Sequence, residues 1–183
     1  MIGSALVIRR ALESDAAALA SVHVTAWQEA YSGLLPSEML SRLDVADRAE
    51  RWASIIASFS RENAGSAFLA VEPDGAKGFV SVSRQRDQAL ADRGYSAEIT
   101  AIYVLESAQR KGVGRALLRE AATHLRQSGH NAAALWVLER NSKARCFYEA
   151  LGACPVAERQ EVRPETVLNE VAYAWDSLSP LLA

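Results

Sequence analysis

The stretch Gln-Arg-Lys-Gly-Val-Gly-Arg-Ala-Leu-Leu-Arg, residues 109–119, combines paired glycines with four basic side chains. The residues before it, 98–104, have the composition of a β-strand, and apolar residues after it recur at helical spacing. The expected order is therefore strand, glycine-rich turn, helix. The first turn of a helix has free N–H groups and partial positive charge, so this turn predicts a pyrophosphate site. For the glycines alone, a tight turn before an ordinary surface helix is an equally good interpretation.

The composition of the whole chain predicts one domain spanning residues 1–183, large enough to bury a core. Half of the residues are hydrophobic, 23% are charged, and the formal net charge is −2. These values argue against disorder and against a broad basic surface for nucleic acid. No apolar run approaches the roughly 18 residues of a membrane span, and the N-terminus has no signal-peptide pattern. We therefore expect a cytoplasmic protein without membrane or nucleic-acid partners.

The cysteines and histidines show no spacing typical of a metal site. Cys146 and Cys154 are eight residues apart, and His23, His124 and His130 form no ligand cluster. We expect no bound metal, and we expect both cysteines to be packing residues, because free cysteine commonly behaves as a small hydrophobe.

Local patterns predict helices and strands in alternation. The expected elements are a strand at 6–9, helices at about 14–27, 37–43 and 47–59, a break at 63–66, a hairpin of 67–71 and 78–82, an extended loop at 84–94, a strand at 98–104, a helix ending near Gly129, a strand at 132–138, a helix at 142–151, and a hairpin of 156–162 and 167–175 with a turn at Arg163-Pro164-Glu165. The strand at 132–138 is continuously apolar, as in a parallel strand covered on both faces. A crossover from 98–104 to this strand would be right-handed, with the glycine-rich turn at a carboxyl strand end, where ligands of α/β sheets bind.

The combined pattern resembles the GNAT superfamily of acyl-CoA-dependent N-acetyltransferases. The matching residues are the strand end Ile102-Tyr103-Val104, the Q-x-x-G-x-G turn at 109–114, and the segment from Asn141 through Tyr148 to Gly152. The order of elements is similar as well. The resemblance implies a mixed α/β (α+β) fold, with a central mixed, mostly antiparallel sheet of six to seven strands and about four to five helices. Ala153 departs from the family, which often has an aromatic residue there.

The resemblance implies acetyl-CoA as cosubstrate. The strand before the turn would pair edge-on with the pantetheine arm, the turn amides would bind the pyrophosphate, and the helix after the next strand would supply an asparagine and a tyrosine. The implied cofactor-binding residues are Ile102, Tyr103, Val104, Gln109, Arg110, Lys111, Gly112, Val113, Gly114, Arg115, Asn141 and Tyr148.

The segment at 26–36 resembles a pattern found in a subset of these enzymes, in which this region and the last hairpin wall the acceptor pocket. Trp27 and Tyr31 are four residues apart and so share one helix face. They are candidate substrate-binding residues, and a role as core residues is equally consistent with this spacing.

Acyl transfer to an amine needs a neutral nucleophile, a stabilised oxyanion and a protonated leaving sulfur. A backbone N–H near Val104 is the candidate oxyanion donor, and Tyr148 is the candidate proton donor. Glu98 is the candidate base through water, because period-2 counting puts it on one face with Ile102 and Val104 unless a bulge intervenes. A peripheral role for Glu98, the weaker candidate Glu29, and an amine deprotonated in solution all remain open.

The predicted function is transfer of an acetyl group from acetyl-CoA to a primary amine of a small molecule or peptide, by direct transfer. The alternative is a catalytically silent acetyl-CoA sensor or partner-binding module with the same fold. A P-loop is disfavoured because Lys111 precedes its glycines, and a Rossmann site because the third glycine is absent. Homodimerisation is an expectation from the family alone.

Overall fold

The computed structural model describes residues 6–62, 64–163 and 166–183. The molecule is built on a seven-stranded sheet with the strand order β1-β2-β3-β4-β5-β7-β6. Every neighbouring pair is antiparallel except β4 and β5, which run parallel. The strands are β1 (Val7–Arg10), β2 (Gly65–Glu72), β3 (Gly75–Arg84), β4 (Ala97–Val104), β5 (Ala133–Leu138), β6 (Cys154–Arg163) and β7 (Thr166–Trp175). The expected mixed, mostly antiparallel sheet is confirmed.

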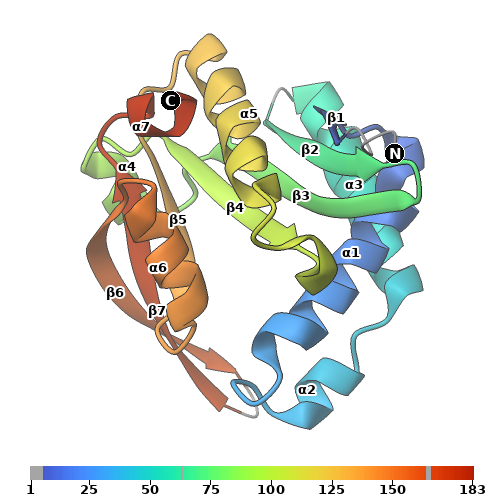
Figure 1. The fold of residues 1–183 in the computed structure, drawn as a ribbon. Coiled ribbons are helices and arrows are strands. Elements are labelled where there is room, and N and C mark those ends of the chain that lie inside the picture. Colours follow the sequence, from blue (N-terminus) through green and yellow to red (C-terminus); the bar gives the residue numbers. More distant parts are fainter. Residues whose placement is uncertain (1–5, 63, 164–165) are drawn as a thin grey trace.

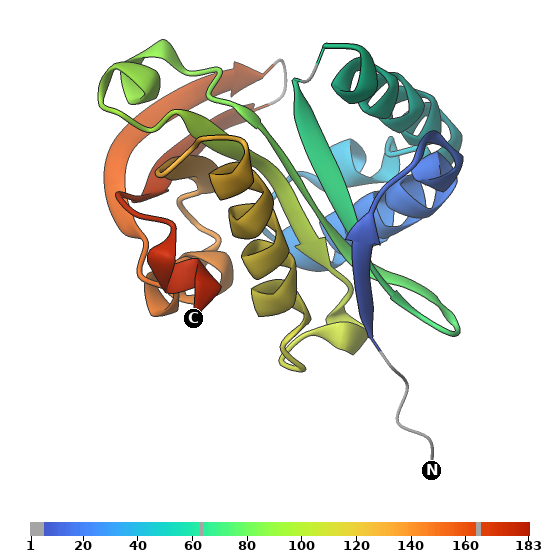
Figure 2. The ribbon, with the colours of Figure 1, turned by 90° about the horizontal axis from the view of Figure 1, so that it is seen from above.

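Helices cover both faces of this sheet (Figures 1 and 2). α5, α6 and α7 lie on one face, and α1 and α3 lie together on the other. The helices are α1 (Ala16–Tyr31), α2 (Ser37–Ser41), α3 (Val45–Glu62), α4 (Gln88–Asp92), α5 (Val113–Gln127), α6 (Ser142–Ala150) and α7 (Ser179–Leu182), with short 3-10 turns at Glu13–Asp15 and Glu106–Ala108.

Two apolar clusters, one on each face, hold the layers together. On the α5 face, the helical stripe that includes Leu117 and Ala121 packs against Val80 and Val82 of β3. On the α1 face, Leu19 and Trp52 pack with Leu69 and Phe79. The period-2 alternation of β2 and β3 supplies both clusters, because successive side chains of a strand point to opposite faces.

The sequence expectation is wrong for the segment at 84–94, which contains α4 instead of a continuous extended loop. The Asp87 carboxylate caps this helix by accepting hydrogen bonds from the N–H groups of Ala89 and Leu90, at 3.0 and 3.3 Å. Leu90, 1% exposed, anchors it. A cap and one buried residue stabilise five helical residues, which are too few to show a period in the sequence.

The two cysteines do not have the expected packing role. Cys146 lies on α6 and Cys154 begins β6, and both side chains are exposed. α7 at the C-terminus was not expected from the pattern. The expected break at 63–66 is too long, because Gly65 and Ser66 already belong to β2. Asn63 of that break and Pro164-Glu165 of the expected turn lie outside the described residues.

The described part of the chain contains neither a membrane-spanning helix nor a metal-binding cluster. None of its helices combines the length and apolarity needed to cross a lipid bilayer. The same residues hold no group of three His, Cys, Asp or Glu side chains placed to bind a metal ion.

Candidate active site

The two parallel strands at the centre of the sheet separate almost as soon as they meet. β4 and β5 pair only at Ala97 with Ala133 and at Glu98 with Ala134, although β4 continues to Val104. Beyond this point the two facing edges carry backbone groups that no β4–β5 ladder satisfies. Such an edge can accept an extended ligand as an additional strand, which makes the opening between β4 and β5 the natural place for a linear cofactor arm.

β4 contains a bulge at Thr100 that decides which face each of its side chains occupies. Ser81 of β3 pairs with Ala101 and Val82 pairs with Ile99, so Thr100 is the extra residue. The Thr100 hydroxyl donates a hydrogen bond of 3.1 Å to the Ser81 carbonyl. A bulge of one residue inverts the alternation of side chains along the strand.

The inversion overturns the expected position of Glu98. Ile99 before the bulge and Ile102 after it both pack in the α5-side cluster, whereas Tyr103 packs in the α1-side cluster. Because Glu98 alternates with Ile99, its side chain lies on the α1 side, opposite to Ile102 and Val104. The expectation that Glu98 shares a face with Ile102 and Val104 is therefore wrong, and the physical reason is the bulge.

Glu98 is also held by a partner that the sequence did not reveal. Its carboxylate, in a residue 6% exposed, accepts hydrogen bonds from Nε and Nη2 of Arg86 at 2.9 and 2.6 Å. The Arg86 backbone N–H adds a third contact to the same carboxylate at 3.3 Å. The pKa of Arg86 is raised, chiefly by its hydrogen bond to Glu98. This bidentate pair fixes the orientation of the carboxylate at the point where β4 and β5 part.

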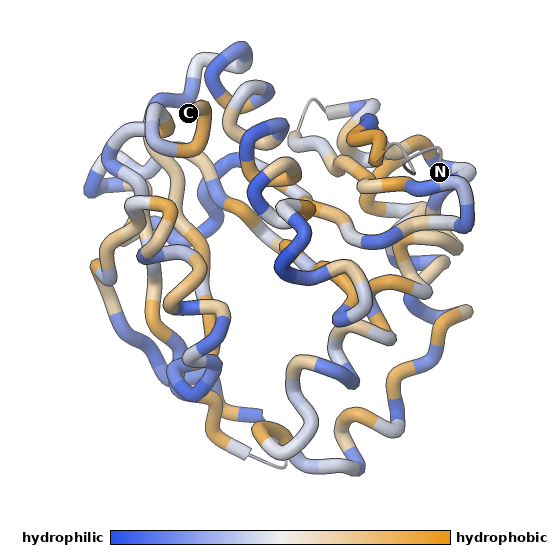
Figure 3. The backbone as a smooth tube through the Cα atoms, in the orientation of Figure 1, coloured by the Kyte–Doolittle hydropathy of each residue, from blue (hydrophilic) through white to orange (hydrophobic). Residues whose placement is uncertain are grey.

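The glycine-rich turn has the geometry of an anion site. Gly112 precedes α5 with φ +85°, in the left-handed region, and Arg110 has φ +60°. The connection from β4 to α5 is hydrophilic along this stretch (Figure 3), and its basic residues Arg110, Lys111 and Arg115 are exposed. Helix α5 therefore begins at a solvent-facing turn with free N–H groups and positive charge around it, as a phosphate requires.

Gln109 and Gly114 have structural roles in this turn. The Gln109 side-chain amide donates a hydrogen bond of 3.0 Å to the Val104 carbonyl, which ties the turn back to the end of β4. A Cβ on Gly114 would lie 3.0 Å from Cζ of Phe147 in α6. The glycine thus permits close approach of α5 and α6, in addition to any role toward a ligand.

α6 brings two of the expected cofactor residues to the same region. The Asn141 side chain caps the helix by accepting a hydrogen bond of 3.2 Å from the Ala144 N–H. Tyr148, 6% exposed, is surrounded by the rings of Phe147, Tyr173 and Trp175. Burial, with a smaller contribution from Tyr31, raises the pKa of Tyr148, so its hydroxyl stays protonated at neutral pH.

The structure brings Trp27 and Tyr31 together with Tyr103. The Trp27 indole N–H donates a hydrogen bond of 2.7 Å to the Tyr103 hydroxyl, and the rings of Trp27 and Tyr31 meet edge to face at 5.0 Å. The Tyr31 hydroxyl interacts with Tyr103 and with the Asn141 side chain, while burial is the main cause of its raised pKa. Tyr31 therefore links α1 to both β4 and the start of α6. The sequence identified the pair on α1 but gave no sign that the Tyr103 side chain would complete the group.

His23 is a second component that sequence reasoning missed. Its Nδ1 accepts a hydrogen bond of 3.1 Å from the Trp52 indole, and its ring stacks on Tyr103 with centroids 5.0 Å apart. Burial, with a smaller effect of Arg48, lowers the pKa of His23 to about 3. A neutral histidine whose Nδ1 is occupied in this way supports the aromatic group as a packing element. Its position four residues before Trp27 on α1 is the signal that would have found it.

Glu29, the weaker base candidate, is engaged elsewhere. Its carboxylate accepts a hydrogen bond of 2.8 Å from the Glu106 N–H, in the 3-10 turn after β4. This contact ties α1 to the approach of the glycine-rich turn.

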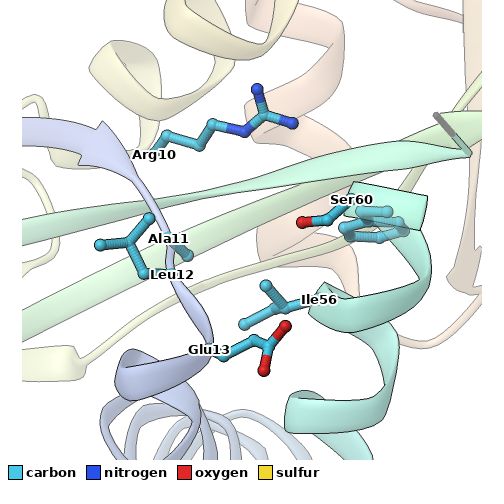
Figure 4. A pocket seen from close by; sticks show the side chains of 7 residues that line it. Arg10, Ala11, Leu12, Glu13, Ile56 and Ser60 are labelled. Carbon is cyan, nitrogen blue, oxygen red and sulfur yellow. The ribbon is translucent and has the colours of Figure 1, made fainter.

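One open hollow lies away from this region (Figure 4). It has a volume of about 580 Å³ and lies between the end of β1 and α3, with Arg10, Leu12, Glu13 and Ile56 among its lining residues. β1 is an edge strand, separated from β5 by three other strands. The hollow contains none of the expected site residues, which come instead from β4, the turn before α5, α6 and α1.

Comparison with known proteins identifies the relatives of this chain. The family model described as Acetyltransferase (GNAT) family matches residues 18–153. An uncharacterized N-acetyltransferase of Bacillus subtilis, YuaI, is 33% identical over 177 residues, covering 96% of each chain. A probable N-acetyltransferase of Mycobacterium tuberculosis, Rv2775, is 32% identical over 142 residues, covering 78% of this chain and 76% of its own.

Solved structures share the fold at lower identity. PaiA N-acetyltransferase from Thermoplasma acidophilum, solved with coenzyme A, aligns with a TM-score of 0.72 and 19% identity over 91% of this chain and 98% of its own. YncA from Salmonella typhimurium, a putative acetyltransferase solved with acetyl-CoA, aligns with a TM-score of 0.67 and 20% identity, covering 96% of this chain and 95% of its own. The family model and the sequence relatives together show that the chain belongs to the GNAT family of N-acetyltransferases.

Proposed function

We propose that this N-acetyltransferase moves the acetyl group of acetyl-CoA directly to a primary amine at the opening between β4 and β5. The observation that carries the proposal is the early end of the β4–β5 ladder beside a turn with free helical N–H groups. An open strand edge suits the amide-bearing pantetheine arm, and the turn suits the pyrophosphate. The two features lie one after the other along the chain, as the two parts of the cosubstrate do.

The cofactor residues follow from this placement. The backbone of Ile102, Tyr103 and Val104 faces the pantetheine, and the turn from Gln109 to Arg115 surrounds the phosphates. Asn141 and Tyr148 approach from α6. What supports this assignment is the exposed basic surface of the turn, the left-handed Gly112 and the position of α6 beside α5.

The reaction has three requirements that this chain can meet. The amine nitrogen attacks the thioester carbonyl carbon, and a backbone N–H near the end of β4 stabilises the oxyanion. As the C–S bond breaks, the Tyr148 hydroxyl gives its proton to the leaving sulfur, and the proton that the amine loses passes through water, or through the base, back to Tyr148. The products are the acetamide and the free thiol. The raised pKa of Tyr148 suits a hydrogen-bond donor that stays protonated throughout the working pH range.

Glu98 is the proposed acceptor of the amine proton, through water. It lies on the α1 face together with Tyr103, which is the face that Trp27 and Tyr31 approach. An ionised carboxylate has about four lone-pair sites, so the three hydrogen bonds from Arg86 leave about one site for a water molecule. Trp27 and Tyr31 form the proposed wall for the acceptor.

The test is a screen for acetyl-CoA-dependent release of free thiol over primary amines, amino acids and peptide N-termini, with mass spectrometry of the product. An acceptor that gains one acetyl group supports the proposal. Acetyl-CoA binding without turnover on any amine would contradict it and would favour the silent binding module.

A further inference from the structure

The α1-side face of the arm formed by β5, β7 and β6 carries a cluster of charged and aromatic side chains that the reaction above does not use. Trp136 on β5 is paired with Ala172 of β7. Both belong to a third, smaller apolar cluster, which also includes Leu90 and Ala134. Glu170 lies two residues from Ala172 and therefore shares the face. Arg159 of β6 is paired with Glu170, so it lies beside it on the same side of the sheet.

The guanidinium of Arg159 occupies what is in effect a cation site. Its Cζ lies 4.1 Å from the centroid of the Trp136 ring. Its Nε donates a hydrogen bond of 2.7 Å to Glu170, and its Nη1 lies 3.9 Å from an oxygen of Asp87. One aromatic face and two carboxylates thus surround one positive charge, which is the environment that proteins use to bind ammonium and guanidinium groups.

This arrangement is incomplete as it stands. The Trp136 indole N–H is buried without a hydrogen-bond partner, and no other side-chain nitrogen or oxygen of the described residues is in this position. A buried donor without an acceptor is costly, and proteins rarely leave one unless a ligand or water serves it in another state. The Arg159 side chain is 42% exposed, so it can move away without disturbing the core.

The cluster lies at the end of β5 that leads into α6. Glu170 pairs with Leu138 at the end of β5, three residues before Asn141, which caps α6. Tyr31 also interacts with Asn141 at the start of α6. A short molecule can therefore present one end to the opening between β4 and β5 and the other end to Trp136.

We propose that the acceptor carries, besides the amine that is acetylated, a second cationic group that replaces the Arg159 guanidinium on Trp136 between Glu170 and Asp87. The chemical class is a diamine or a molecule with a basic side chain. This inference rests on the proposed function for the identity of the reacting end. Arg159 acts as an internal competitor, and its departure uncovers the face of the Trp136 ring.

The first experiment is calorimetry on the full chain saturated with coenzyme A, with three ligands of one length: 1,5-diaminopentane, pentylamine and 5-aminopentanoate. We expect the diamine to bind about tenfold more tightly than pentylamine, since it gains the aromatic face and the carboxylates. We expect 5-aminopentanoate to bind most weakly. Equal affinities, or preference for 5-aminopentanoate as if Arg159 bound its carboxylate, would overturn the proposal.

Two variants should act in opposite directions. Arg159→Ala removes the competitor, so the diamine should bind several-fold more tightly, whereas Glu170→Gln removes a carboxylate and should weaken its binding about tenfold. Glu158→Gln is the matched control, because Glu158 is the neighbour of Arg159 on the opposite face of β6 and should leave binding unchanged. If Glu170→Gln fails to fold, Arg159→Ala still decides. Unchanged or weaker diamine binding in Arg159→Ala would contradict the competition.

Turnover separates this inference from the proposed function. A diamine that binds with the expected preference, while neither it nor any other amine is acetylated, would leave the cation site standing and would contradict the function. Acetylation of pentylamine and the diamine with equal kcat/KM, without preference in binding, would support the function and overturn the cation site.

Discussion

Tyr148 combines a polar hydroxyl with an almost wholly apolar surrounding of aromatic rings. Because burial keeps the hydroxyl protonated, Tyr148→Phe should fold normally and bind acetyl-CoA within a few-fold of the parent chain. Its kcat should fall by about 10²-fold, the lower range for loss of a positioned proton donor. Steady-state kinetics with a validated amine checks this, and an unchanged kcat would remove Tyr148 from the chemistry.

Glu98 is the proposed acceptor of the amine proton, and its substitution tests that role. Glu98→Gln removes the proton acceptor while keeping the size of the side chain, so the increase of kcat/KM with pH on the acid side should disappear. The pH–rate profile measures this directly. Glu72→Gln, a carboxylate at the far end of β2, serves as the control and should keep the parent profile. If Glu98→Gln retains the parent profile too, the amine must lose its proton by another route.

The sequence identified several residues of the candidate site, but it did not show which side chains contact them. Trp27 and Tyr31 were recognisable because helical spacing places them on one face, and the structure does bring them together. The Arg86 partner of Glu98 could not be predicted, because it comes from the segment between β3 and α4, which has no periodic pattern. The assigned roles of Tyr148 and Glu98 stay predictions until they are measured.

At the scale of elements, the beginning of α5 and its contact with α6 determine the turn. A Cβ at Gly112 meets no atom within 4 Å, so Gly112→Ala is disfavoured only through its φ of +85°, whereas a Cβ at Gly114 lies 3.0 Å from Phe147. We expect Gly112→Ala to cost about 1 kcal/mol of stability. Gly114→Ala should weaken binding of coenzyme A by separating α5 from α6.

A double-mutant cycle tests whether Gly114→Ala weakens coenzyme A binding by separating α5 from α6. Phe147→Leu shortens the side chain opposite Gly114, so the pair Gly114→Ala with Phe147→Leu should regain much of the affinity lost in Gly114→Ala. Calorimetry with coenzyme A measures each corner of the cycle. Strict additivity would show that Gly114 serves the ligand alone and not the packing of the two helices.

Long periodic elements were predictable, and short ones were not. α5 and α6 follow from apolar residues at helical spacing, together with Asn141 at the start of α6 and the glycines at both ends of the pattern. α4 and α7 have five and four residues, which is little more than one turn, so tertiary contacts such as those of Leu90 decide them. The packing of Gly114 against Phe147 could not be predicted either, because the two residues are far apart in the sequence.

At the scale of the whole molecule, the buried group around His23 makes stability depend on pH. His23 has a pKa of about 3 in the folded chain against an ordinary value of 6.5, so the unfolded chain binds the proton more readily. Stability should therefore be fully present above about pH 6.5 and should fall as the pH drops toward 3, by at most about 1.4 kcal/mol per pH unit. Urea unfolding at pH 7.5 and pH 5 measures the difference. In His23→Gln the difference should shrink, and an equal difference in both chains would show that other groups cause it.

The overall architecture could be predicted from the order of strands and helices, because each type of element has its own period. The separation of β4 from β5 could not, since Ala133 to Leu138 reads as a strand paired along its whole length. Which edges remain open depends on twist and on what packs between the strands, and neither is written in a local pattern.

The bulge at Thr100 has a consequence for how variation can act on this protein. Loss of that single codon would remove the extra residue, so that Ala101 would follow Ile99 directly and keep its pairing with Ser81. Tyr103 would still face the α1 side and Ile102 the α5 side, because these two already alternate with Ala101 and Ile99. A deletion at Thr100 would therefore remove the bulge and its hydrogen bond to the Ser81 carbonyl while leaving the side chains beyond it on their present faces.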